Sequence, residues 1–412
     1  MKYVLVLCDG MADYPNAEIG GKTPLMLAHT AGMNALAPYS LIGLAKTVPD
    51  GFEPASDVAN LGVLGYDVKQ CYTGRSPLEA LSIGVHLKDG ELALRANLVT
   101  LSDEQNFEDK RMLDYGAGEI STQEASELID TLNQAFASDV LRFYTGTSYR
   151  HCLVVDGALP KDTLTPPHNI TSQRIGGYLA KGPLADALNN MTKQSYDILC
   201  NHPINIKRQK QGKRPANAVW FWGEGTPPHL DDFHAKYHKN GVMISAVDLL
   251  KGIGVASGMQ VVDVPGATGT LDTDYNAKAR YAINALENGA DFCMVHIEAT
   301  DECGHQRDLK GKVQAIENID EKIISPILSH FASKGEDFKM LVMPDHPTPV
   351  SLGKHTSDAV PFMLFDSRQM IAATAACKPI GENMQVTFDE QSAKASGVYY
   401  ADPWQIIDKL FA

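Results

Sequence analysis

The chain has 412 residues and a formal net charge of −14 at neutral pH, with 44% hydrophobic and 21% charged residues. This length and composition predict a globular protein with two domains or one large α/β unit. The acidic balance argues against nucleic acid or an anionic membrane as a partner, and no apolar stretch approaches the roughly 18 residues of a membrane span.

The first predicted element is a strand over residues 2–8, "KYVLVLC". Its apolar run is short, ends in a charge and has no basic region before it, which is unlike a signal peptide and predicts a cytoplasmic protein. The seven cysteines are an odd number without a CxxC pair, so we expect reduced thiols and neither a disulfide framework nor a zinc finger.

The middle of the chain differs from both ends. A strand pattern over residues 91–101, a helical pattern over 121–136 and a hairpin over 140–155, with Gly146 at its turn, predict a small α+β domain. We place this insert at residues 90–180, so that residues 1–89 and 181–412 form the other domain. The order of the patterns indicates one domain interrupted by another.

The flanking parts predict an α/β fold with a doubly wound, mostly parallel sheet. Besides residues 2–8, continuous apolar runs at 218–222, 290–297, 338–343 and 360–365 are typical of strands buried on both faces. Helical patterns at 245–253, 274–287 and 310–333 alternate with them, as βαβ units require.

Acidic residues follow three of these strands. Asp9 follows the first strand, Asp345 follows the strand at 338–343, and Asp301 lies just past the strand at 290–297. Each alone could be a turn or N-cap residue. Because ligand sites in doubly wound sheets collect at the carboxyl ends of the strands, we expect the three to form one site.

Histidines accompany two of these acids. His305 follows Asp301 by four residues, which places both on one face of a helical turn, and His346 and His355 follow Asp345. Mixed oxygen and nitrogen ligands on successive loops suit manganese, zinc or magnesium. The spacing therefore predicts a site for divalent metal ions.

Ser56 precedes a predicted helix over residues 57–64. The N-terminus of a helix favours an anion such as phosphate, although an ordinary N-cap serine is the alternative interpretation. A serine hydroxyl can be activated by metal coordination, and its product would be a phosphoserine held at the helix end. Beside the predicted metal ligands, we interpret Ser56 as a nucleophile.

Several spaced motifs together resemble one known family. They are "LVLCDGMAD", "SDVANLGVLGYD", "YTGRSPLEALSIGV", "SYRHCLVV", "NHPINIKRQKQGKRPAN", "PGATGTLDTDY", "HIEATDECGH", "MPDHPTP" and "KHTSDAVPF". In order and over essentially the whole chain, they are similar to the archaeal type of cofactor-independent phosphoglycerate mutase, in the alkaline phosphatase superfamily.

The resemblance implies interconversion of 3-phosphoglycerate and 2-phosphoglycerate through a phosphoserine at a two-metal site. It implies an alkaline phosphatase-like catalytic domain, an insert that helps to enclose the substrate, and two divalent ions (manganese, magnesium or zinc). By motif match, one metal would be held by Asp9, Ser56, Asp345 and His346, and the other by Asp301, His305 and His355. Arg75, Arg150, His151 and Lys278 would bind the small phosphorylated substrate.

Two related activities stay open. Family members often have glycine where this chain has Ala55 and Ser76, so the acceptor could differ, as in a homoserine kinase-like phosphotransferase, although no Walker-type motif is present. A metal-dependent phosphatase would result if water reached the phosphoserine. The sequence also leaves open whether the chain forms a homo-oligomer.

Overall fold

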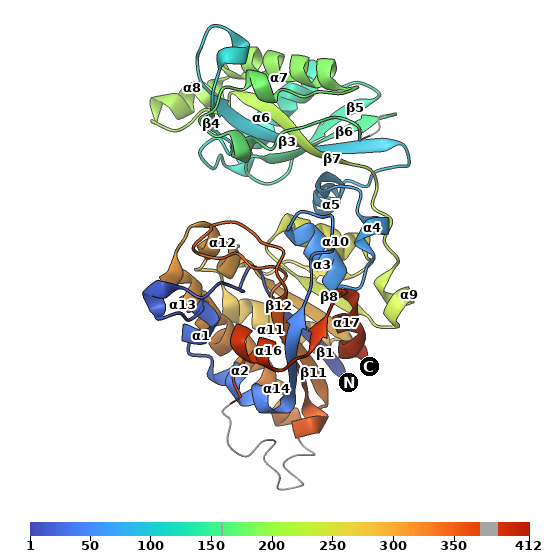
Figure 1. The fold of residues 1–412 in the computed structure, drawn as a ribbon. Coiled ribbons are helices and arrows are strands. Elements are labelled where there is room, and N and C mark those ends of the chain that lie inside the picture. Colours follow the sequence, from blue (N-terminus) through green and yellow to red (C-terminus); the bar gives the residue numbers. More distant parts are fainter. Residues whose placement is uncertain (158–159, 371–385) are drawn as a thin grey trace. The chain divides into compact units, whose positions relative to one another are not determined.

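The computed structural model describes residues 1–157, 160–370 and 386–412. The chain divides into two compact units, one formed by Met1–Tyr72 with His229–Ala412 and the other by Thr73–Pro228 (Figure 1). The second unit is wider at both ends than the predicted insert at 90–180. It includes helix α5 (Arg75–Ser82), which packs on strand β3 (Glu91–Leu101), and strand β7 (Ala218–Gly225), which pairs with β3.

The first unit is built on an eight-stranded sheet of order β13-β2-β12-β11-β1-β10-β8-β9. Its strands are β1 (Lys2–Cys8), β2 (Ser40–Ala45), β8 (Gly241–Ile244), β9 (Gln260–Val262), β10 (Phe292–Ile297), β11 (Phe338–Met343), β12 (Val360–Asp366) and β13 (Tyr399–Tyr400). Only β12 runs antiparallel to its neighbours. The predicted α/β class with a mostly parallel sheet is confirmed.

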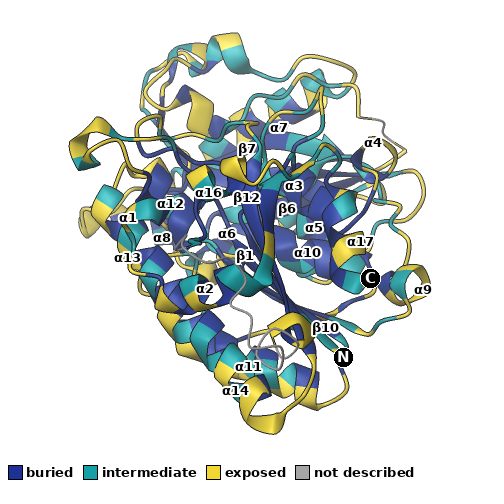
Figure 2. Ribbon diagram, turned by 60° about the horizontal axis from the view of Figure 1, so that its bottom comes forward, coloured by how far each residue is buried: buried dark blue, intermediate teal, exposed yellow. Residues whose placement is uncertain are grey.

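Both faces of the central strands are buried, which explains their continuous apolar runs. In β1 every side chain from Val4 to Cys8 is fully buried (Figure 2). Val4 and Val6 pack in a cluster with residues of helices on one face, and Leu5 and Leu7 point to the opposite face. A solvated face would instead have produced alternation of polar and apolar residues.

Helices cover the two faces of this sheet (Figure 1). Among the described residues, the helices of the first unit include α1 (Pro24–Leu27), α2 (Ala31–Leu36), α3 (Ser56–Val63), α4 (Val68–Cys71), α9 (Phe233–Tyr237), α10 (Asp248–Ala256), α11 (Tyr275–Glu287), α12 (Ala299–His305), α13 (Leu309–Ile319), α14 (Ser325–Lys334), α16 (Glu390–Ala395) and α17 (Trp404–Phe411). The predicted helix at 310–333 is therefore α13 and α14, joined by a π-helical turn over Asp320–Ile324. Within the described ranges, no helix has the length and apolar character needed to cross a membrane.

The second unit pairs an antiparallel five-stranded sheet with helices. Its other strands are β4 (Met112–Asp114), β5 (Leu141–Tyr144) and β6 (Arg150–Asp156), and its other helices are α6 (Thr122–Phe136), α7 (Ala185–Leu199) and α8 (Pro203–Lys210). The predicted hairpin around Gly146 is the β5–β6 pair. The side chain of Ser121 caps α6, which begins where the sequence predicts a helix.

One predicted strand belongs to a different sheet than expected. The run at 218–222 lies in β7, which pairs antiparallel with β3 in the second unit and is not part of the parallel sheet. Val219 and Phe221 pack in a core beside α6, whereas Trp220 and Trp222 pack on the opposite face. Burial on both faces therefore gave β7 the continuous apolar pattern of a parallel strand.

A half-buried carboxyl group near the loop after β1 gives a testable pH dependence of stability. Glu390 accepts hydrogen bonds from the backbone N–H of Asp13 (3.2 Å) and from the hydroxyl of Thr23. Burial raises the pKa of Glu390 to about 7. Because the folded carboxyl group then holds its proton more tightly than the unfolded one, the free energy of unfolding should fall as the pH rises from about 4.5 to 7.

We expect this decline to be smaller by about 2 kcal/mol in a Glu390→Gln variant, whose side chain does not titrate. Urea denaturation of both proteins at pH 5 and pH 7.5 measures the difference. Parallel pH dependences for the two proteins would show that Glu390 does not contribute it.

Candidate functional site

Three neighbouring strands bring the predicted acidic residues together. The strands β11, β1 and β10 are adjacent and parallel, so their carboxyl ends meet at one edge of the sheet. Asp9 directly follows β1, Asp345 follows β11, and Asp301 lies in α12 just after β10. All three carboxylates are buried at this edge.

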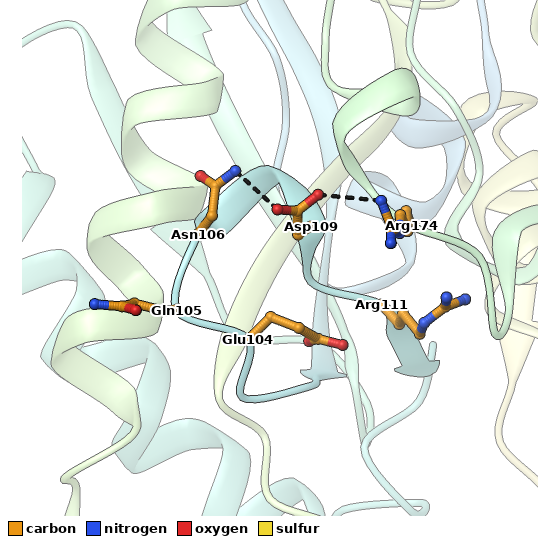
Figure 3. Close-up of a pocket in the computed structure, with 6 residues that line it drawn as sticks. All are labelled: Glu104, Gln105, Asn106, Asp109, Arg111 and Arg174. Atoms are coloured by element: carbon orange, nitrogen blue, oxygen red, sulfur yellow. Dashed lines mark hydrogen bonds and ion pairs between the residues drawn. The ribbon is translucent and has the colours of Figure 1, made fainter.

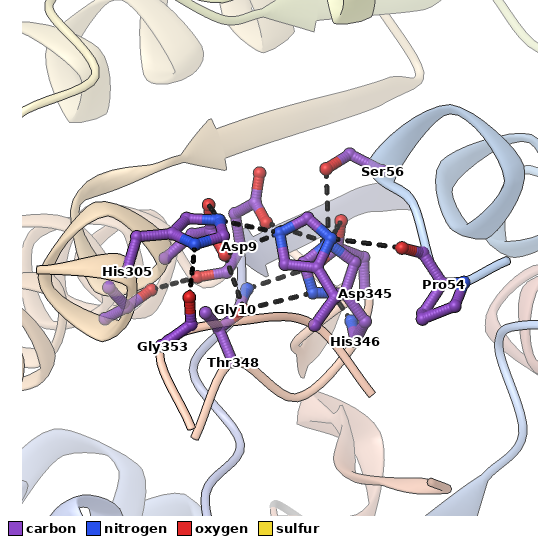
Figure 4. Close-up of polar contacts among 12 residues, drawn as sticks. Asp9, Gly10, Pro54, Ser56, His305, Asp345, His346, Thr348 and Gly353 are labelled. Atoms are coloured by element: carbon purple, nitrogen blue, oxygen red, sulfur yellow. Dashed lines mark hydrogen bonds and ion pairs between the residues drawn. The ribbon is translucent and has the colours of Figure 1, made fainter. Parts of the chain in front are cut away.

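Asp9, Asp345 and His346 form a first group of ligand atoms within 4.8 Å of one another (Figure 4). His346 Nε2 lies 3.5 Å from Asp9 Oδ1 and 3.4 Å from Asp345 Oδ2. Ser56 Oγ lies 3.2 Å from the same nitrogen. The first predicted ligand set therefore occupies one place in the fold.

Asp301, His305 and His355 form a second group beside the first. Asp301 Oδ2 lies 3.2 Å from His305 Nε2, and Asp301 Oδ1 lies 3.2 Å from His355 Nε2. The two histidine Nε2 atoms are 2.9 Å apart. His346 also lies within 4.8 Å of ligand atoms of Asp301 and His355, so it adjoins both groups.

Backbone carbonyl groups orient two of the histidine rings. His305 Nδ1 lies 3.1 Å from the carbonyl oxygen of Gly353, and His355 Nδ1 lies 3.1 Å from that of Pro54. A ring nitrogen that donates to a carbonyl carries the proton, which leaves the Nε2 lone pair of a neutral ring for a metal. Both rings thus present Nε2 toward Asp301.

Asp345 is held by two donors from other segments. The backbone N–H of Gly10 donates to Asp345 Oδ1 (3.1 Å), and Asn60 Nδ2 donates to Asp345 Oδ2 (2.9 Å). Asn60 lies one turn after Ser56 in α3 and also donates to the Ser56 carbonyl (2.8 Å). These bonds connect the loops after β1 and β11 with the N-terminal end of α3.

The residues present fit divalent metal ions. Asp9 Oδ1 is buried and has no hydrogen-bond partner among the described residues. Burial and the nearby Asp345 and Asp301 carboxylates raise the pKa of Asp9 well above its usual range. A cation would compensate both the unpaired oxygen and the like charges, and the oxygen and nitrogen donors suit manganese, zinc or magnesium.

The electrostatics of the second group favour a positive charge beside Asp301. Burial alone would raise the pKa of Asp301, but hydrogen bonds with His305 and His355 hold that pKa well below its usual range. The Asp301 carboxylate in turn raises the pKa of His305 to about 9. A positive charge is therefore favoured between these side chains.

Ser56 is the first residue of α3, and Ala55 occupies the N-cap position without a side-chain hydrogen bond to the helix. The alternative interpretation of Ser56 as an N-cap serine is therefore wrong. The Val58 N–H of the first turn donates to Asp57 Oδ1 (2.9 Å). The helix dipole favours an anion near the serine hydroxyl at the start of the helix.

The predicted substrate arginines lie together in the second unit. Arg75 Nε and Arg95 Nε each lie 2.8 Å from a carboxylate oxygen of Glu79. Burial together with the charges of Arg75 and Arg150 lowers the pKa of Arg95 to about 10. The Arg95 guanidinium also lies 4.2 Å from the ring centre of Trp222. The charge of Arg150 also acts on Glu79, so positive charge exceeds negative charge in this cluster, which suits a phosphate or carboxylate group.

The other two predicted substrate residues are buried. His151 accepts a hydrogen bond at Nδ1 from the N–H of Gly146 (3.1 Å), its Nε2 has no hydrogen-bond partner among the described residues, and burial lowers its pKa to about 3. Lys278 belongs to the first unit, is fully buried and donates to the carbonyl oxygen of His296 (3.0 Å). Burial lowers the pKa of Lys278 to about 8.

Sequence reasoning missed several polar partners at these sites. His296 Nε2 lies 3.0 Å from Asp9 Oδ2, and the Thr348 hydroxyl contacts Asp301. Neither residue follows a strand end at a ligand spacing, although a histidine within the apolar run of β10 was a usable signal. Arg95 and Asn60 were missed as well, and a charge within the buried run of β3 could have revealed the former.

The second unit also has a surface pocket away from the arginine cluster (Figure 3). It is lined by Glu104, Gln105, Asn106, Asp109, Arg111 and Arg174. Asp109 accepts from Asn106 Nδ2 (3.0 Å) and from Arg174 Nη1 (3.3 Å), so its carboxylate is already partnered. None of the predicted site residues lines it.

Comparisons with known proteins point to one family. The family model described as 2,3-bisphosphoglycerate-independent phosphoglycerate mutase matches residues 37–205. A protein of that name from Methanosarcina acetivorans is 46% identical over 395 residues, which cover 96% of this chain and 95% of the relative. A protein described as probably having the same activity, from Geobacter sulfurreducens, is 43% identical over 411 residues, which cover 100% and 99%.

Two solved structures are similar over nearly the whole chain. A protein from Pyrococcus horikoshii gives a TM-score of 0.78 at 28% identity and covers 99% of this chain and 96% of its own. The cofactor-independent phosphoglycerate mutase from Thermoplasma acidophilum gives a TM-score of 0.63 at 25% identity and covers 100% and 99%.

Proposed function

The chain belongs to the 2,3-bisphosphoglycerate-independent phosphoglycerate mutase family, and from this premise we propose that Ser56 carries the phosphoryl group between the two hydroxyls of glycerate. The activity is the interconversion of 3-phosphoglycerate and 2-phosphoglycerate. One observation carries the role of Ser56: its hydroxyl, at the start of α3, lies 3.2 Å from His346 Nε2 and so adjoins both groups of candidate metal ligands.

In the first transfer, a bond forms between Ser56 Oγ and phosphorus while the bond from phosphorus to the 3-oxygen of the substrate breaks. The serine proton passes to the leaving alkoxide, so glycerate and phosphoserine result. The first-turn amides of α3 stabilise the phosphoserine as an anion. In the second transfer the 2-hydroxyl of glycerate attacks the phosphoserine, and the proton returns to Ser56.

Divalent ions supply two kinds of chemistry when bound, because they favour the serine alkoxide and neutralise charge on the phosphoryl oxygens. Asp9, Asp345, His346 and Ser56 would hold one ion, and Asp301, His305 and His355 would hold the other. Two observations support this assignment. Asp9 Oδ1 is buried and has no hydrogen-bond partner among the described residues. The Nδ1 atoms of His305 and His355 contact backbone carbonyl oxygens, which leaves Nε2 of each ring for a metal.

The phosphoserine stage requires protection from water, since hydrolysis would turn the enzyme into a phosphatase. We keep the prediction that the inserted unit helps to enclose the substrate. The arginine cluster Arg75, Arg95 and Arg150 supports this, because it concentrates positive charge in that unit, which favours a phosphate or carboxylate group.

Removing the guanidinium of Arg150 should weaken substrate binding. A charge-assisted hydrogen bond contributes about 1.5–3 kcal/mol, so we expect Arg150→Met to raise KM for 3-phosphoglycerate by roughly 10- to 100-fold. Arg142→Met on the neighbouring strand β5 is the matched control, because Arg142 is exposed there. Steady-state kinetics measure both, and equal KM values for the Arg150 and Arg142 variants would remove Arg150 from substrate binding.

The activity assay also separates the related reactions. The protein is supplied with manganese and 3-phosphoglycerate, without bisphosphoglycerate, and 2-phosphoglycerate and free phosphate are followed separately. We expect 2-phosphoglycerate with little free phosphate. Free phosphate as the main product would indicate a phosphatase, and inertness until ATP and homoserine are added would indicate the kinase-like activity.

The remaining assignments rest on the family. We propose that the resident divalent ions are manganese, with magnesium or zinc as the alternatives. We also propose that the protein is cytoplasmic and acts in glycolysis and gluconeogenesis. Its substrate is a small phosphorylated molecule. The N/O donor set supports the divalent ions.

A further inference from the structure

Thr348 connects the two groups of candidate metal ligands. It lies in the loop after β11, is fully buried, and its hydroxyl contacts Asp301 Oδ1 in the second group and His346 Nδ1 (3.3 Å) in the first (Figure 4). Its backbone is fixed as well, because its N–H donates to the Ala12 carbonyl (3.2 Å) and its carbonyl accepts from Lys312 Nζ (2.8 Å).

Two glycines leave space for this side chain. Gly10, which follows Asp9, has a left-handed φ of +61°, and a Cβ at this position would lie 2.5 Å from Thr348 Oγ1. A Cβ on Gly304, which precedes His305, would lie 2.4 Å from the Thr348 carbonyl oxygen and 2.8 Å from its Cγ2. The loops that carry ligands of both groups thus close tightly around Thr348.

Hydrogen-bond accounting assigns the protons in this chain of contacts. The single proton of the Thr348 hydroxyl is donated to Asp301 Oδ1. Toward His346 the hydroxyl oxygen then accepts, and Nδ1 must carry the ring proton. A neutral ring that is protonated at Nδ1 keeps its lone pair on Nε2.

From this geometry we propose that Thr348 is a positioning residue: its hydroxyl fixes the tautomer and orientation of His346 and couples that ring to Asp301, so that both ligand groups are preformed for their cations. This inference rests on the proposed function, since it takes Asp301 and His346 as metal ligands. Ser56, Asp9 and Asp345 all lie on the Nε2 side of His346.

The test compares Thr348→Val with Thr348→Ser. Valine keeps the shape without the hydroxyl, and serine keeps the hydroxyl. Metal-free proteins are titrated with Mn²⁺ by calorimetry, and their folding is checked by thermal melting. We expect Thr348→Val to bind Mn²⁺ roughly 10- to 100-fold more weakly than the wild type, and Thr348→Ser to stay within about threefold.

The outcomes separate the two levels of the account. Wild-type affinity in Thr348→Val would overturn the role of the hydroxyl while leaving the metal site intact. A loss of about tenfold or more in Thr348→Ser would overturn it too, and this criterion does not require the valine variant to fold. A wild-type protein that binds no Mn²⁺ would instead overturn the proposed function together with this inference.

Discussion

Replacing Ser56 with alanine should lower kcat by roughly 10⁵- to 10⁶-fold, as expected when the group that forms the covalent bond is removed. The hydroxyl that this substitution removes lies 3.2 Å from His346 Nε2. The six carboxylate and imidazole ligands stay in place in this variant, so we expect it to retain bound metal. The measurement combines mutase turnover with the metal content of the purified protein.

The matched control is Ser333→Ala, at the exposed end of α14. It removes the same type of hydroxyl from the end of α14 that leads into the start of β11, whereas the site follows the carboxyl ends of the strands, so turnover should be unchanged. If Ser56→Ala retained a turnover within tenfold of the control, Ser56 would not be the nucleophile. If it lost both turnover and metal, the serine would act mainly as a ligand.

Removing the metal ions should lower turnover by at least about 10³-fold, and added Mn²⁺ should restore it. Three buried carboxylates meet at this edge of the sheet, and without cations their like charges are relieved by protons, as the raised pKa of Asp9 indicates. In that state the serine lacks the charge that favours its alkoxide, and the phosphate meets an acidic surface.

The measurement is turnover after dialysis against a chelator, followed by titration with Mn²⁺ while metal content is recorded. Dialysis against buffer alone is the control for loss by handling. Full turnover in protein that contains less than one metal ion per ten chains would show that the reaction does not depend on these ions.

The strand ends made much of the candidate site predictable. Asp9 and Asp345 follow continuous apolar runs, and a strand with one exposed face would instead alternate polar and apolar residues. The strands β11, β1 and β10 are neighbours in the sheet, which brings the two acidic residues together. The four-residue spacing of Asp301 and His305 likewise falls on one helix, α12. The predicted family, fold class and enzyme class are confirmed by the relatives and by the similar structures.

The missed features depend on contacts between distant segments. Strand β7 joins the second sheet because Ala218 pairs with Val99, far away in the chain, and an apolar run does not specify its partner. The contacts of α5 and β7 with β3 likewise extend the second compact unit to Thr73–Pro228, beyond the predicted insert at 90–180. Thr348 and Asn60 have no strand-end pattern, and only the folded loops bring them to Asp301 and Asp345.

The most direct test of the central claim is a single-turnover experiment with 3-phosphoglycerate that carries labelled phosphate. The reaction is stopped with acid at short times, and the digested protein is analysed by mass spectrometry. We predict a phosphoserine at Ser56 that appears before 2-phosphoglycerate and then decays. Formation of 2-phosphoglycerate with no phosphoserine at any time, or with the label on a residue other than Ser56, would contradict the account.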